Sequence, residues 1–363
     1  MNNNNDKLLY VIIFILILII IFLLGIIAFK KRNIKIYPEP KDFLYINTSE
    51  INEPKSLFIY KEDHTEIKDK NILRICYCID NYLIYPTLVS MTSALENNNK
   101  EKNIIIFYLL IPGNFKQKNV EIFDSLKKKY LVKIHYYKIP FRFHHLRAWM
   151  GGTATIYYKL YIPLIFPHLK RILYLDGDTL VHKDLSDLFN LDFKDNYVLG
   201  YPFHSVSMMD KWGKKLVNYI NGGVILFNLE KIIKDNKDGE LFEFTLKNNK
   251  KLYFLEQDSL NLVFYNKVGL LPLKYGIYLF GNITTYRKSV KKQLRVELNE
   301  TELIEALNDP ALVHFAGCNP KIWGRPHKNA FGDLSVCYKA HDDFYIYANK
   351  TEYAEIIYKT YMK

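Results

Sequence analysis

Short apolar runs alternate with helical patterns between Ile72 and Leu175, and this alternation restricts the possible folds more than any other feature of the sequence. Each run is five to eight residues long and rich in β-branched or aromatic side chains, as is typical of a strand buried on both faces. The runs are Ile72–Ile79, Ile104–Ile111, Val132–Ile139 and Arg171–Leu175, with helical patterns between them at Pro86–Asn97, Phe115–Tyr130 and Thr155–Phe166. Strands connected through helices cross over in a right-handed sense and pair in parallel, so the pattern predicts an α/β fold with a mostly parallel sheet.

The alternation is less regular after Asp178. The further strands that we expect are Tyr197–Phe203, Tyr219–Asn228 and Val313–Phe315, and the further helices are Leu229–Asn249, Gln257–Tyr265 and Asp343–Lys359.

An uncharged apolar run from Leu8 to Phe29 lies near the start of the chain. Its 22 residues suffice to cross the hydrocarbon core of a bilayer as a helix, which takes roughly 20. A cleavable signal peptide is the rival interpretation, but its apolar stretch is about 7–15 residues and ends in small residues. This run is longer and is followed by Lys30, Lys31 and Arg32. We therefore expect a retained, single-pass signal-anchor that holds residues 8–29 in the membrane.

The sequence leaves open on which side of the membrane the rest of the chain lies. Basic residues after the run favour a cytoplasmic domain, whereas four Asn-x-Ser/Thr sequons would suit a lumenal domain, of Golgi or secretory-pathway type if the protein is eukaryotic. The expected organisation is an anchor at 1–33, a proline-containing stalk at 34–70, an α/β domain at 71–340 and a helical tail at 341–363.

Composition excludes several classes of protein. With 24% charged and 49% hydrophobic residues the chain is not disordered, and four cysteines are too few for a disulfide-built scaffold. The 50 Lys+Arg exceed the 38 Asp+Glu and give a net charge of +12, which alone would suit a nucleic-acid partner. No nucleic-acid-binding motif accompanies this charge, so we expect no such partner.

Two carboxylates, Asp176 and Asp178, follow directly after the buried run Arg171–Leu175. Ligands of parallel α/β sheets bind at the carboxyl ends of strands, and two carboxylates one residue apart can share one divalent cation. Gly177 allows a close turn between them. An exposed Asp-Gly turn is the alternative, but a position at the end of a buried strand favours a metal site.

The same residues also suit a second class of enzyme. In haloacid-dehalogenase-like phosphohydrolases, an Asp at a strand end is the nucleophile, and Asp176 with Asp178 superficially resembles that arrangement. Those motifs open the domain and have glycine after the second Asp, whereas here glycine lies between the acids and about a hundred residues of α/β chain come first.

Five blocks together resemble glycosyltransferase family 8, the retaining family that includes glycogenin-like and lipooligosaccharide galactosyltransferases. They are CIDNYLIYPTLVSMTSALENN, ATIYYKLYIPLIFPHLKRILYLDGDTLVHKDLSDLF, YINGGVILFNL, LEQDSLN and HFAGCNPKIW, in the order of the family. The resemblance implies a GT-A fold, which is Rossmann-like, and transfer of glucose or galactose from a UDP-sugar to a glycan, glycolipid or glycoprotein acceptor, with retention and with Mn²⁺ or another divalent cation.

The resemblance assigns metal ligands and phosphate contacts. Asp176 and Asp178 match the motif that binds Mn²⁺ and the donor diphosphate, and His314 matches the third protein ligand. Gly317 and Lys321 belong to the same block as His314, and Lys321 would meet a phosphate. Its lysine and tryptophan are each one place later than in the family block.

The resemblance also assigns the nucleotide contacts. Asn81 and Tyr82 match the base-binding turn, where a phenol can stack on uracil and an amide can read its edge. Asp80 would supply the carboxylate that the family often places two residues before this Asn. Lys159 takes the place of the usual arginine, which keeps the positive charge but loses a bidentate phosphate contact.

The sugar pocket and the catalytic residues come from two further blocks. Asn221 with the two glycines after it resembles the strand that lines the pocket, although the glycines alone are also typical of a β-bulge. Gln257 and Asp258 match the Gln-Asp pair at the donor sugar, and Gln257 is our candidate for the side chain beneath the anomeric carbon. A non-catalytic glycan-binding protein is a third possibility, but it would not need both Asp176 and Asp178 beside Gln257.

Overall fold

The computed structural model describes residues 70–139, 146, 154–203, 212–213, 218–278, 300–316, 321–324 and 334–362. The predicted anchor at 8–29 and nearly all of the predicted stalk lie outside these ranges. Among the described residues, no helix has the length and apolar character that crossing a membrane requires.

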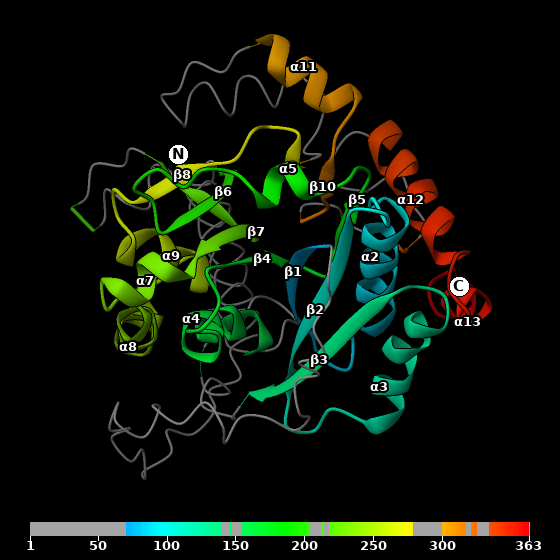
Figure 1. Cartoon of the computed structure of the whole chain (residues 1–363), viewed down its shortest axis with the longest axis horizontal. Helices are drawn as coiled ribbons and strands as arrows, with labels where there is room; N and C mark the ends of the chain where they lie inside the picture. Colours follow the sequence, from blue (N-terminus) through cyan, green and yellow to red (C-terminus); the bar gives the residue numbers. More distant parts are fainter. Residues whose placement is uncertain are drawn as a thin grey trace, which may run out of the picture. The chain divides into compact units, whose positions relative to one another are not determined.

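A mixed sheet forms the centre of the described fold, with the strand order β3-β2-β1-β4-β7-β6-β8 (Figure 1). Its strands are β1 (Asn71–Cys78), β2 (Asn103–Pro112), β3 (Val132–Ile139), β4 (Arg171–Leu175), β6 (Val198–Pro202), β7 (Ile220–Asn228) and β8 (Val268–Leu270). The pairs β1–β2, β2–β3, β1–β4 and β6–β8 are parallel, whereas β7 runs antiparallel to β4 and β6. The predicted α/β fold with a mostly parallel sheet is confirmed.

A smaller sheet has the order β5-β10-β9, with β5 at Thr179–Val181, β9 at Tyr275–Tyr278 and β10 at Leu312–His314. The sequence predicted only β10 of these three. Strands of three or four residues contain at most two periods of side-chain alternation, so β5 and β9 leave no readable pattern.

Two hydrophobic clusters fill the space on the two faces of the main sheet. On one face, side chains such as Ile75 and Tyr77 of β1 pack with Leu88 of α2 (Ile84–Glu96). On the other face, Cys76 packs with Tyr158 of the 3₁₀ segment Ala154–Tyr161. Successive residues of β1 therefore alternate between the two faces, which is why its sequence is apolar throughout.

The remaining described helices surround these sheets. They are α3 (Gln117–Asp124), α4 (Ile162–Ile165), α5 (Ser186–Phe189), α7 (Leu229–Lys234), α8 (Asp238–Asn248), α9 (Glu256–Val263), α11 (Glu300–Asn308), α12 (Leu334–Ala348) and α13 (Ala354–Tyr361).

Two long helices that the sequence predicted are each divided in two. The expected helix Leu229–Asn249 breaks into α7 and α8, because Asn236 takes a left-handed backbone with φ of 53°. The expected helix Asp343–Lys359 comprises the end of α12 and most of α13. Figure 1 shows α12 beside α2, and the Asn97 amide at the end of α2 donates to the Tyr347 hydroxyl at 2.7 Å.

The order of the strands indicates where on the main sheet a ligand would bind. The chain leaves β1 in one direction through β2 and β3, and returns on the other side of β1 as β4. Such a reversal separates the connections at the carboxyl ends of β1 and β4, where open α/β sheets bind ligands. Asp80 follows β1 and Asp176 follows β4 at this point.

Candidate functional site

Two carboxylates and one imidazole form the centre of the site. Asp176, Asp178 and His314 each offer one ligand atom, and these atoms all lie within 4.8 Å of one another. The Nε2 atom of His314 is 3.1 Å from Oδ1 of Asp178 and 3.5 Å from Oδ2 of Asp176. The three residues that the sequence proposed as metal ligands are therefore brought together.

Pairing of the smaller sheet brings His314 to the two aspartates. Thr179 of β5 lies opposite His314 of β10, and the Phe315 amide donates to the Asp178 carbonyl at 2.9 Å. On the other side, the Asp176 amide donates to the Gly223 carbonyl of β7 at 2.8 Å. The turn is thus hydrogen-bonded to both sheets, which fixes the carboxylates against the imidazole.

Gly223 allows the imidazole and one carboxylate to lie directly against β7. A Cβ atom at this position would lie 2.0 Å from Cε1 of His314 and 2.7 Å from Oδ2 of Asp176. Any other residue would therefore displace the imidazole and the carboxylate. Two carboxylates and one imidazole, held together in this way, fit a divalent cation such as Mn²⁺.

Positive groups balance the buried carboxylates. The Lys321 ammonium forms an ion pair with Asp178. Burial alone would raise the pKa of Asp178, but Lys321 and His314 outweigh it and hold that pKa well below its ordinary value. Burial disfavours a charged imidazole, yet the two aspartates raise the pKa of His314 to about 9. The two aspartates therefore favour positively charged groups beside them.

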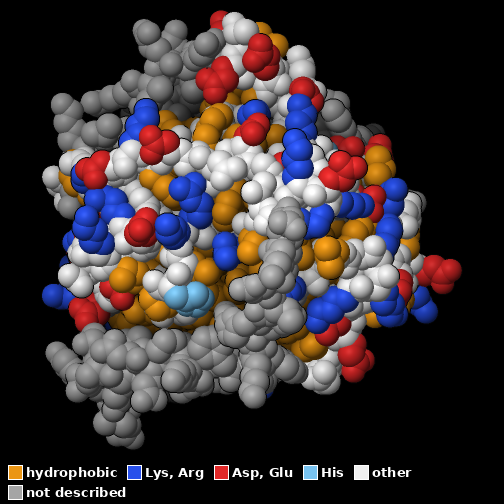
Figure 2. All heavy atoms as spheres, viewed as in Figure 1, with side chains coloured by type: hydrophobic (Ala, Val, Ile, Leu, Met, Phe, Trp, Pro, Cys, Tyr) orange, Lys and Arg blue, Asp and Glu red, His pale blue; other side chains and the backbone are white. Residues whose placement is uncertain are grey.

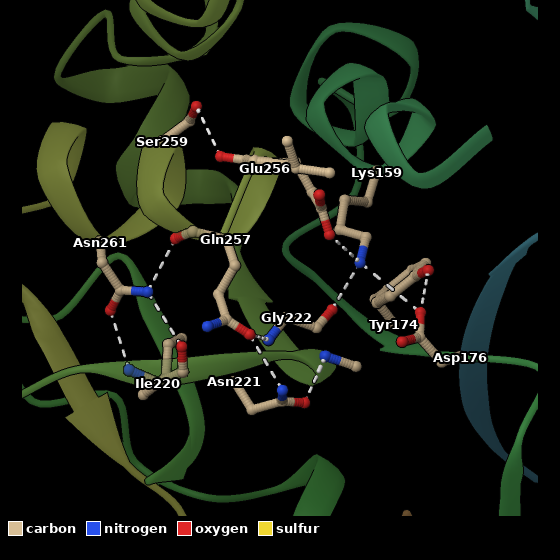
Figure 3. A network of polar contacts seen from close by, with 12 residues as sticks. Lys159, Tyr174, Asp176, Ile220, Asn221, Gly222, Glu256, Gln257, Ser259 and Asn261 are labelled. Atoms are coloured by element: carbon tan, nitrogen blue, oxygen red, sulfur yellow. Dashed lines mark hydrogen bonds and ion pairs between the residues drawn. The ribbon is translucent and has the colours of Figure 1, made fainter. Parts of the chain in front are cut away.

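Each oxygen of Asp176 has its own surroundings. Its Oδ1 atom accepts a hydrogen bond from the Tyr174 hydroxyl at 2.5 Å and lies 3.5 Å from the Lys159 ammonium, as Figure 3 shows. Its Oδ2 atom is the one that approaches His314. Tyr174 and Lys159 therefore turn the second oxygen toward the cluster, as residues outside a ligand shell commonly do.

Lys159 is buried at the centre of a network between β4, β7 and α9 (Figure 3). Besides Asp176, its ammonium lies 2.7 Å from the Gly222 carbonyl and 3.1 Å from Oε1 of Glu256. These three contacts match the three donors of an ammonium group, and they go to acceptors of the protein. The predicted contact of Lys159 with a phosphate stays a prediction.

Glu256 joins the site, although the sequence analysis did not select it. Its carboxylate is buried beside Lys159, and it comes directly before Gln257 in the first turn of α9. The signal in the sequence was a charged residue next to the Gln-Asp pair. The residue before it, Leu255, is buried at φ 55° and ψ −123°, a strained backbone that turns the start of α9 toward Lys159.

Gln257 is fixed at both ends of its amide. Its Oε1 atom accepts hydrogen bonds from the Asn221 side chain at 2.9 Å and the Gly222 amide at 2.8 Å, as Figure 3 shows. Its Nε2 atom donates to the Tyr219 hydroxyl at 3.2 Å. The predicted neighbours Asn221 and Gln257 are therefore in direct contact.

Asp258 follows Gln257 in the chain and shares Tyr219 with it as a hydrogen-bond partner. Its carboxylate accepts hydrogen bonds from the Tyr219 hydroxyl at 2.5 Å and from the backbone amides of Tyr253 and Phe254 at 2.6 and 2.8 Å. These contacts hold the loop that enters α9. The predicted catalytic role of Asp258 stays a prediction.

The turn after β1 presents Tyr82 to solvent. Oδ1 of Asp80 accepts the amides of Tyr82 and Leu83 at 2.8 and 3.1 Å, and the Asn119 side chain donates to Asn81 at 2.8 Å. The turn is thus ordered by side chains, while the Tyr82 ring is 79% exposed. An ordered turn with an exposed ring is suitable for stacking on a base.

Lys321 is the other predicted phosphate contact, and helix α12 supports the segment that carries it. The Tyr345 hydroxyl donates to the Trp323 carbonyl at 2.8 Å, and the His341 ring lies 2.9 Å from the Ile322 carbonyl. Gly317, from the same sequence block, lies outside the described residues.

Comparisons with known proteins agree with this fold and site. The sequence model of glycosyl transferase family 8 matches residues 74–326. A lipopolysaccharide 1,2-glucosyltransferase of Escherichia coli is 26% identical over 71% of this chain and 75% of its own length. Among solved structures, galactosyltransferase LgtC, in complex with donor and acceptor sugar analogs, has a TM-score of 0.62 at 19% identity, over 77% of this chain and 96% of that one.

The bifunctional glycosyltransferase WbbM gives a TM-score of 0.61 at 20% identity, over 82% of this chain but only 53% of that one. The structural neighbours show that the fold is of the GT-A type. The predicted family is therefore confirmed, and since the family model covers most of the α/β domain, the chain belongs to glycosyl transferase family 8 and is a hexosyltransferase.

Proposed function

We propose that this enzyme transfers glucose or galactose from a UDP-sugar to a glycan, glycolipid or glycoprotein acceptor, with retention of configuration and with the help of a divalent cation. The observation that carries the proposal is the cluster of Asp176, Asp178 and His314, which Gly223 allows to form against β7. A relative named as a glucosyltransferase and a fold neighbour named as a galactosyltransferase support a hexose donor.

In this proposal Asp176, Asp178 and His314 hold the cation, preferably Mn²⁺. When bound, it would neutralise the diphosphate of the donor and stabilise the departing UDP. Lys321 lies against Asp178 and can contribute a second positive charge to the same diphosphate. Lys159 holds Asp176 and Glu256 in place, so that the cluster keeps its geometry during the reaction.

We propose Gln257 as the group beside the anomeric carbon. Its amide is hydrogen-bonded by Asn221 and the Gly222 amide, so its position is fixed by β7. A neutral amide is a poor nucleophile, which favours attack by the acceptor hydroxyl on the same face that UDP leaves. The Tyr82 ring would stack on uracil at the other end of the donor, with Asn81 and Asp80 beside it.

The other candidate functions have less support. Membership of the family argues against a haloacid-dehalogenase-like phosphohydrolase and against a glycan-binding protein without activity. Lysine and arginine side chains are intermixed with acidic ones on the face that Figure 2 shows.

A panel of UDP-sugars tests the proposed reaction. The full-length chain, incubated with each donor and an acceptor glycan, should release UDP from UDP-glucose or UDP-galactose, and the product should have the anomeric configuration of the donor by NMR. An inverted product would contradict retention. Release of phosphate from simple phosphate esters, without turnover of any UDP-sugar, would instead support the phosphohydrolase.

We also propose that residues 8–29 anchor the enzyme in a membrane as a single-pass signal-anchor. The length of the run and the absence of charge support this. The full-length chain should sediment with membranes and resist extraction by carbonate, whereas a variant with Leu16 and Ile19 both changed to lysine should be recovered in the soluble fraction. Recovery of the unaltered chain in the soluble fraction, with its N-terminus intact, would contradict the anchor.

A further inference from the structure

Three buried hydroxyls form a continuous chain beneath the metal cluster. The Tyr77 hydroxyl of β1 is 3.0 Å from Oγ of Ser90 on α2, and that oxygen is 2.9 Å from Oγ1 of Thr179 on β5. Oγ1 of Thr179 in turn donates to the Asp176 carbonyl at 2.9 Å. Each of the three side chains is at most 1% exposed, so water does not compete for these bonds.

The donor and acceptor of each of these hydrogen bonds follow from the number of protons that a hydroxyl has. A hydroxyl has one proton to donate, and Thr179 uses its proton for the Asp176 carbonyl. Thr179 therefore accepts from Ser90, and Ser90 accepts from Tyr77. Aligned hydrogen bonds of this kind polarise and strengthen one another. The chain acts as one unit that ends on the backbone of a metal ligand.

Helix α2 also reaches β5 and the aspartate turn through other small side chains. Oγ of Ser93 accepts the Val181 amide at 2.9 Å, and a Cβ atom at Gly177 would lie 2.5 Å from Oγ1 of Thr87. Burying a hydroxyl costs free energy unless the hydroxyl is hydrogen-bonded. Alanine at these positions of α2 would be of similar size and would not have that cost. Contact with β5 therefore accounts for the hydroxyls of Ser90 and Ser93, whereas the buried Thr87 hydroxyl lies against Gly177 and has no hydrogen-bond partner among the described residues.

Thr179, the last of the three hydroxyls, contacts both the turn that carries Asp176 and the strand that carries His314. Thr179 bonds to the Asp176 carbonyl, and it is also the residue of β5 that lies opposite His314. A shift of Thr179 would therefore change the separation between Asp176 and His314. In contrast, none of the bonds that link these three hydroxyls reaches Gln257 or the turn after β1.

We propose that Tyr77, Ser90 and Thr179 are positioning residues that set the affinity of the site for its divalent cation. The inference rests on the proposed metal site, but not on the identity of the donor sugar. Residues outside the ligand shell that orient ligands typically change metal affinity by about 10- to 100-fold when they are replaced.

The test compares Mn²⁺ affinity, by titration calorimetry on the full-length chain, among matched variants. Ser90→Ala should weaken Mn²⁺ binding about 10-fold. Tyr77→Phe should weaken Mn²⁺ binding less, because the bond from Ser90 to Thr179 and the bond from Thr179 to the Asp176 carbonyl remain. The control is Thr92→Val, which also removes a buried hydroxyl from α2, but one that bonds only to the Leu88 carbonyl of its own helix among the described contacts. It should bind Mn²⁺ as the unaltered chain does.

Turnover gives a second readout. A high concentration of Mn²⁺ should restore the turnover of Ser90→Ala toward that of the unaltered enzyme, and a merely structural defect would not respond in this way. Unchanged Mn²⁺ affinity in a folded Ser90→Ala variant, or an equal loss in Thr92→Val, would overturn the proposal. If Ser90→Ala does not fold, the affinity of Tyr77→Phe decides in its place. Mn²⁺ binding without turnover of any UDP-sugar would overturn the proposed function alone, and the affinities would still decide this inference.

Discussion

Replacement of Asp178 with asparagine should reduce hexosyl transfer on the order of 10³-fold. The amide removes the negative charge between His314 and Lys321, so two positive groups would then face the cation without compensation. The side chain keeps its size, so the loss comes from charge and not from packing. Steady-state UDP release and calorimetric titration with Mn²⁺ measure the two consequences separately, and circular dichroism verifies that the variant is folded.

Asp187→Asn is the matched control, because Asp187 is an exposed carboxylate on α5, a short distance further along the chain. It should release UDP at the unaltered rate, since surface charges at a distance from the site contribute little. Full activity of Asp178→Asn at low Mn²⁺ concentration would show that the cluster is not the metal site.

Replacement of Gly223 with alanine should weaken metal binding on the order of 100-fold. The added methyl group would lie 2.0 Å from Cε1 of His314, closer than any real contact, so the imidazole must leave its place. Gly223 lies within β7, and its carbonyl accepts the Asp176 amide, so its backbone cannot move away without breaking that hydrogen bond. Mn²⁺ titration and thermal unfolding together distinguish loss of the site from loss of the fold.

The neighbouring Gly222→Ala variant provides the control for this prediction. Its Cβ atom would lie 3.4 Å from Lys159, Glu256 and Gln257, which is ordinary contact and does not reach His314. Gly222→Ala should therefore keep its Mn²⁺ affinity, even if the binding of the donor changes. An equal loss of affinity in both variants would mean that β7 tolerates no side chain here for a reason unrelated to the metal.

The sequence predicted the main sheet except β8, because its other strands have at least five residues and are largely buried. The runs at β1, β2, β3 and β4 are recognisable without any knowledge of their partners. The two aspartates could be identified because they directly follow β4. The short strands β5 and β9 could not, since their conformation depends on pairing with β10 and not on a local pattern.

The contacts within the site could not be predicted, because a sequence does not reveal which residues of separate strands and helices lie opposite one another. Nothing in the sequence indicates that Lys159 would lie between Asp176 and Glu256, because three separate elements must meet there. The turn into α9 was also hidden, since its left-handed residue is Leu255 and not a glycine. The hydroxyl chain was missed for the same reason: Ser90 in a helix is unremarkable until β5 is placed against it.

The family resemblance supplied what local patterns could not. It connected His314 with Asp178, which lies 136 residues earlier in the chain, and with Asp176, and the structure brings the three together. Spacing alone gave no basis for that connection. The departures from the family pattern, such as lysine at position 159, have their physical account only in the structure, where a buried ammonium meets three acceptors.

The central claim is that Asp176, Asp178 and His314 bind a divalent cation that hexosyl transfer requires. The most direct measurement is UDP release from UDP-glucose and UDP-galactose by the full-length chain after treatment with EDTA, before and after addition of Mn²⁺. We predict no release above background in EDTA, and turnover that rises with Mn²⁺ to saturation. Equal turnover in EDTA and in Mn²⁺ would contradict the claim.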